Sequence, residues 1–99
     1  MRPDEPAIHV LVEDIADPSI VADVRAEILA VFKEVTVVKG AWVVAVVASD
    51  TRGRWDVGMR GPKGSHFVSF AAMPAQVAQV AAAHVRRTLR RLFASDVSH

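Results

Sequence analysis

Basic side chains in the second half of this 99-residue chain have the clearest capacity for chemistry. The eight lysines and arginines that follow residue 50 form two groups, one in a turn-rich segment at 52–63 and one at 86–91. Concentrated positive charge attracts phosphate groups whatever the nucleotide sequence. The candidate contacts for an anion, a nucleic acid or a charged partner are Arg52, Arg54, Arg60, Lys63, Arg86, Arg87, Arg90 and Arg91.

Patterns for catalysis or metal binding are weak. The chain has no cysteine, which removes disulfides, thiolate metal sites and cysteine nucleophiles. None of the four histidines has a second ligand at a metal-binding spacing, no Gly-x-Ser-x-Gly occurs, and the 61–64 turn is too short for a phosphate loop. Glu13, Asp14 and Asp17 could hold a hard cation, but Asp17 is better explained as a helix cap. We expect no enzyme, no cofactor and no metal.

Charge is divided unevenly along the chain. Residues 1–50 contain four Lys or Arg and nine Asp or Glu, whereas residues 51–99 contain eight and two. The halves therefore carry −5 and +6, which nearly cancel in the total of +1.

The hydrophobic content of 52% is enough for the chain to fold, and the length is that of one domain. We expect a single domain over 7–93, with a disordered lead-in at 1–6 and a frayed tail at 94–99.

Neither a membrane span nor an export signal is predicted. The longest apolar run, 41–48, has eight residues, whereas a membrane-spanning helix needs about 20. The first residues, with two prolines and two acids among six, do not form a secretory signal. We expect a soluble, cytoplasmic protein.

The first half of the chain predicts a strand, a helix and a second strand. Alternating polarity over 7–13 predicts a strand, and Asp17-Pro18 predicts the start of an amphipathic helix that ends near Lys33. The β-branched run at 35–49 predicts strand structure. Lys39-Gly40 interrupts it as either a hairpin turn or a bulge, which decides between four and five strands.

The second half predicts two more strands and a helix. Turns at 50–53 and 61–64 bracket a strand at 54–60, and 65–71 alternates again. The 74–93 segment has helical periodicity, with apolar residues on one side and arginines on the other. The fold class is therefore α+β: a two-layer domain of order β-α-β-β-β(-β)-α, with an antiparallel meander sheet packed against two amphipathic helices.

Part of this order resembles a known family. A helix, three strands and an alanine-rich final helix, here with 75–84 rich in alanine, resemble the double-stranded-RNA-binding domain over 18–93. That family begins its last helix with a lysine cluster that grips phosphates. Here the corresponding turn reads Pro74, Ala75, Gln76, Val77, and an additional strand comes first. We therefore assign no family on the sequence.

Both the odd-numbered and the even-numbered residues of the 42–48 segment are apolar, which predicts a strand covered on both faces. Either the helices lie on opposite faces of the sheet, or a second chain covers one face. The leading hypothesis is a small non-enzymatic protein-interaction module, a homodimer or a binder of another protein. Its contacts would come from the 7–13 edge strand or from a sheet face containing Trp42, Val43, Val44 and Val47. The alternatives are a nucleic-acid-associated protein using the arginines, a small-ligand pocket protein or enzyme, and a plain monomer.

Overall fold

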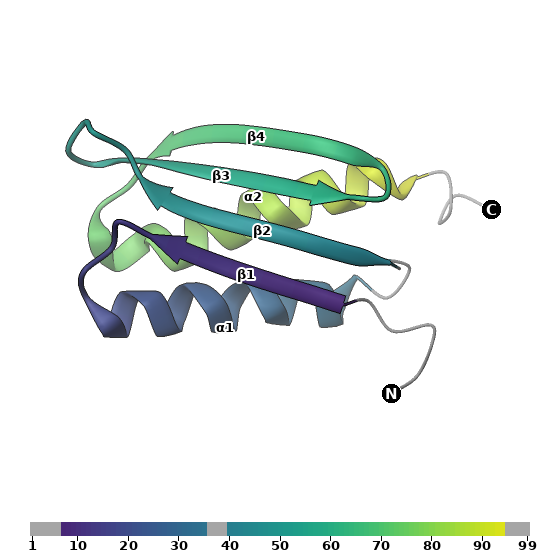
Figure 1. Ribbon diagram of the computed structural model, residues 1–99, viewed down its shortest axis with the longest axis horizontal. Helices are drawn as coiled ribbons and strands as arrows, with labels where there is room; N and C mark the ends of the chain where they lie inside the picture. Colours follow the sequence, from purple (N-terminus) through teal and green to yellow (C-terminus); the bar gives the residue numbers. More distant parts are fainter. Residues whose placement is uncertain (1–6, 36–39, 95–99) are drawn as a thin grey trace.

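Four strands and two α-helices build the domain in the predicted order, as a computed structural model shows for residues 7–35 and 40–94 (Figure 1). The two-layer α+β class is confirmed. The question of a turn or bulge at Lys39-Gly40 falls partly on residue 39, which lies outside the described residues. The elements are β1 (Ala7–Glu13), α1 (Pro18–Glu34), β2 (Ala41–Ala48), β3 (Arg54–Gly61), β4 (Gly64–Ala71), a short 3-10 turn η1 (Pro74–Gln76) and α2 (Val77–Leu92).

The sheet is mixed, and the prediction of a wholly antiparallel meander is wrong for its first strand. The strands lie in the order β1-β2-β3-β4, with β1 parallel to β2 and the later pairs antiparallel. Because α1 lies between β1 and β2 in sequence, it carries the chain back along the sheet, and the second strand then runs in the same direction as the first.

Helix α1 begins where Asp17 and Pro18 predict it. The Asp17 carboxylate accepts hydrogen bonds from the Ser19 hydroxyl at 2.7 Å and from the Ser19 backbone N–H at 2.9 Å. These bonds favour the ionised carboxylate, so they hold the pKa of Asp17 below its ordinary value. The helix ends at Glu34, one residue beyond the predicted end.

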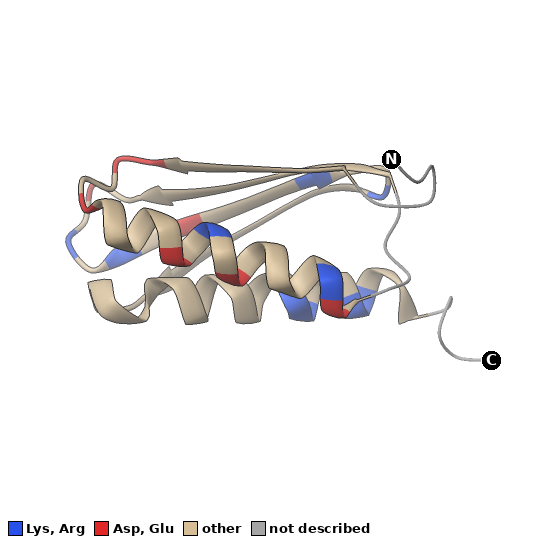
Figure 2. Cartoon of the chain, turned by 90° about the horizontal axis from the view of Figure 1, so that it is seen from below, with Lys and Arg blue, Asp and Glu red and all other residues tan. Residues whose placement is uncertain are grey.

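Both helices cover the same face of the sheet (Figure 2). α1 packs beneath β1 and against α2, and α2 packs beneath β3. The strand residues that meet them are fully or partly buried and alternate with residues on the opposite face. The core is thus a single layer between sheet and helices, and the other side of the sheet has no helix of the described chain over it.

Trp42 anchors one end of this core. Its side chain is 1% exposed, and its ring centroid lies 6.0 Å from that of Phe32 and 6.1 Å from that of Phe93. Gly61 gives the indole its space. A Cβ placed on Gly61 would overlap the ring carbons of Trp42, whereas a Cβ on Gly58 would meet no atom within 4 Å.

This difference predicts opposite tolerance at two glycines of one strand. We expect Gly61→Ala to lower the free energy of unfolding by about 1–3 kcal/mol, because the methyl group must displace the packed indole. Gly58→Ala should change it by no more than about 0.5 kcal/mol. Chemical denaturation followed by Trp fluorescence measures both, and equal losses at the two positions would contradict this account of the core.

Candidate functional site

The face of the sheet turned away from the helices carries three rows of side chains that cross all four strands. We call Leu11, Ala45, Gly58 and Phe67 the central row, because strand pairing places them in one line. On one side lies the acidic row, and on the other the basic row, each named for its charged members. The acidic row is Glu13, Val47, Asp56 and Ser69, and the basic row is His9, Val43, Arg60 and Ser65.

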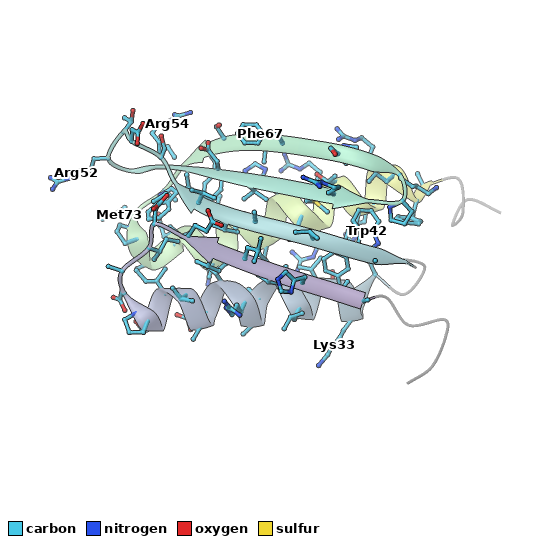
Figure 3. All side chains as sticks on the ribbon, in the orientation of Figure 1. Lys33, Trp42, Arg52, Arg54, Phe67 and Met73 are labelled. Atoms are coloured by element: carbon cyan, nitrogen blue, oxygen red, sulfur yellow. The ribbon has the colours of Figure 1, made fainter. Side chains whose placement is uncertain are left out.

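The middle of this open face is apolar and hollowed. Phe67 is 72% exposed and projects from β4 (Figure 3), and Val43 is 38% exposed. A depression of about 300 Å³ lies between them, where Gly58 places no side chain. An exposed aromatic ring beside an empty space of this kind is typical of a surface that receives another molecule.

Only half of the predicted dimer face lies on this surface. Val43 and Val47 are on the open face. Trp42 and Val44 are 1% and 0% exposed beneath the helices, so assigning them to the dimer face is wrong. Successive residues of a strand point to opposite faces of the sheet. Because every residue of this run is apolar, the sequence does not show which face packs against the helices.

The basic residues of the turn-rich segment are spread over three places. Arg52 and Arg54 lie at the β2–β3 end of the sheet (Figure 3), and Arg60 lies on the open face. Lys63, in the β3–β4 turn, has its Nζ 3.4 Å from the Leu92 carbonyl oxygen, to which it donates, and 4.6 Å from the Phe93 ring centroid. It therefore fastens the hairpin to the end of α2, where a cation also suits the helix dipole.

The four arginines of α2 divide into two pairs. Arg86 Nε donates to Glu34 Oε2 at 2.6 Å, and Arg90 Nη2 donates to the same oxygen at 3.3 Å, so this pair joins the two helices. Arg87 and Arg91 instead line a groove of about 450 Å³ between α2 and β4. Nothing in the sequence marks this groove, because its walls come from segments that are separate along the chain.

The eight basic side chains therefore do not form one patch. They lie at two ends of the sheet, on its open face and on two sides of α2. In the described part of the chain, no cluster of three or more His, Asp or Glu could hold a metal ion. No helix within residues 7–35 and 40–94 is long and apolar enough to cross a membrane.

The chain matches no protein-family model and no curated protein sequence.

Proposed function

We propose that this chain is a small, non-enzymatic protein-interaction module that self-associates through the open face of its sheet. The observation that carries the proposal is the position of both helices on one side, which leaves the apolar central row uncovered on the other (Figure 2). The plainest alternative is a monomer with one helix on each face of the sheet, and here both helices lie on the same face. A sheet can leave one face to water when that face carries polar residues, and the acidic and basic rows are of this kind, but the central row between them is apolar.

Charge selects a second copy as the occupant of the open face. On each strand, the members of the acidic and basic rows lie symmetrically about a member of the central row. The proposed twofold axis lies between the two sheets, parallel to the central row and perpendicular to the strands. It places the open face of one copy on the open face of the other and reverses the strand direction. Asp56 then faces the partner's Arg60, and Glu13 faces the partner's His9. A surface that complements itself in this way is what a twofold interface requires.

The apolar members match under the same rotation. Val47 faces the partner's Val43, and the two Phe67 rings approach each other beside the hollows over Gly58. Two sheets packed face to face lie about 10 Å apart and about 30° from alignment, so each ring has room to turn into a hollow. Apolar groups thus meet apolar groups along the whole middle of the face.

The other twofold arrangement is less favourable. An axis along the strands would place the acidic row on the partner's acidic row and Asp56 opposite the partner's Val47. Four carboxylates would then gather in one strip with no cation opposite them. Like charges in an interface cost binding energy, so the axis along the central row is the one we propose.

The size of the face limits the affinity. Four strands about 4.8 Å apart and about 25 Å long give a contact of roughly 20 by 25 Å on each copy. That is small for a stable specific interface, so we expect a dimer that dissociates in the micromolar range.

Other routes of association have less support. β1 and β4 are the edge strands of the described sheet, and pairing through the 7–13 edge would leave the central row exposed. A nucleic-acid contact would need the arginines on one track, whereas Arg86 and Arg90 are paired with Glu34.

Charging the open face should dissociate the dimer. We expect the wild-type chain to sediment mainly as a dimer at ~200 μM, and Val43→Lys to weaken dimerisation at least ~10-fold, since an ammonium group would face the partner's Val47. Leu29→Lys is the matched control: Leu29 is 41% exposed, close to the 38% of Val43, but lies on α1. Sedimentation velocity measures the dimer fraction, and circular dichroism confirms that each variant is folded.

Two results would defeat this proposal. One is a wild-type chain that stays monomeric up to ~500 μM. The other is a dimer that Leu29→Lys disrupts while Val43→Lys leaves it intact.

The proposed axis also predicts which variants should pair. Asp56→Arg and Arg60→Asp should each weaken their own homodimer by about tenfold or more, because like charges then face each other twice. When the two variants are mixed, both arginines of the first chain face the two aspartates of the second, so opposite charges meet at both contacts. Native mass spectrometry of the mixture should therefore show heterodimer well above both homodimers.

Salt provides the control for this experiment. The preference for the heterodimer should fall at ~1 M ammonium acetate, a volatile salt that suits native mass spectrometry, because exposed charges are then screened over about 3 Å. A statistical mixture of the three dimers at low salt would rule out the axis along the central row.

A further inference from the structure

The groove between α2 and β4 is a second surface, on the helix side of the sheet. It exists because α1 packs beneath β1 and α2 beneath β3, which leaves the inner side of β4 only partly covered. One wall is a single face of α2, with His84, Arg87, Thr88 and Arg91 at helical positions i, i+3, i+4 and i+7. The other side is formed by β3 and β4, through Val57, Met59, Ser65, His66, Phe67 and Val68.

Positive charge in this groove meets no counter-charge among the described residues. Arg87 and Arg91 are one helical turn apart, and no carboxylate is among the residues that line the groove. Within the described residues neither arginine takes part in an ion pair, whereas their neighbours Arg86 and Arg90 share Glu34. The two guanidinium groups are therefore available to an anion from outside the chain.

The other polar groups of the groove also suit an anion with several oxygen atoms. The Nε2 atom of His66 is buried and is the one enclosed side-chain polar atom in the described chain without a hydrogen-bond partner. His84 is held by its ring contact with Phe70, at 5.3 Å between centroids. Thr88 supplies a hydroxyl group, and Val57, Met59 and Val68 supply apolar surface.

We propose that this groove binds a small organic phosphate monoester. A guanidinium group can donate two parallel hydrogen bonds to the oxygens of a phosphate. Two guanidinium groups beside an imidazole and a hydroxyl group offer more hydrogen-bonding groups than the two oxygens of one carboxylate can use. The volume of about 450 Å³ lies in the range of small-molecule sites, and the apolar residues take up the organic group of the ester. This inference does not depend on self-association through the open face.

The test is a titration with phenyl phosphate in ~50 mM NaCl, followed by two-dimensional NMR. We expect saturable shifts of the Thr88 and His66 resonances, while those of His9, which lies on β1 and on the open face, stay in place. Phenyl phosphate should bind more tightly than inorganic phosphate, because the apolar residues contact only the ester. Arg87→Gln/Arg91→Gln should weaken binding at least ~10-fold.

Arg86→Gln/Arg90→Gln is the matched control, because it removes the same charge from the other side of α2. The affinity for phenyl phosphate should stay within about twofold of the wild type, since these substitutions change only the long-range attraction between the chain and the phosphate. The proposal is overturned if phenyl phosphate gives no saturable shift up to ~10 mM, or if both double variants weaken binding equally. The Val43→Lys variant should bind phenyl phosphate like the wild type, so a failure here is separable from a failure of self-association.

Discussion

The packing of both helices against one face of the sheet determines what the rest of the molecule exposes. α1 and α2 lie side by side, joined at one end by Glu34 with Arg86 and Arg90, and they bury Trp42, Val44 and Val46. The helices cannot then reach the other face, where Val43 and Phe67 remain exposed. The same arrangement leaves the inner side of β4 partly uncovered, so the open face and the groove both follow from one packing choice.

Strand pairing turns the open face into an ordered surface. The register places Leu11, Ala45, Gly58 and Phe67 in line, with Glu13 and Asp56 in the row on one side and His9 and Arg60 in the row on the other. The opposite charges of Asp56 and Arg60 come from two positions of β3 on either side of Gly58. In the proposed dimer, a second copy turned over the central row places Asp56 of each chain opposite the partner's Arg60, which gives the proposed self-association a definite geometry.

Local features predicted most of the fold. Asp17 and Pro18 mark the start of α1, and the glycine-containing turns delimit β3 and β4. The parallel direction of β1 escaped prediction, because it depends on the path of α1 across the sheet. The sequence also did not predict which alternate residues of β2 face the helices, since Trp42 and Val43 are both apolar and only the position of the helices decides which is buried. The separation of Arg86 from Arg87 depends on Glu34, which is 52 residues away from Arg86. The groove depends on His66 of β4 and His84 of α2 lining the same space.

The most direct test of the central claim is an isotope-filtered NOE experiment on an equal mixture of ¹³C-labelled and unlabelled chains at ~1 mM. Val43 and Val47 are four residues apart on one strand, about 13 Å, so their methyl groups are too far apart for a contact within one chain. Across the proposed axis they are neighbours. The account predicts intermolecular NOEs between the methyl groups of Val43 and Val47 and between the two Phe67 rings. Intermolecular NOEs confined to backbone protons of the β1 or β4 edge, or none at all, would contradict it.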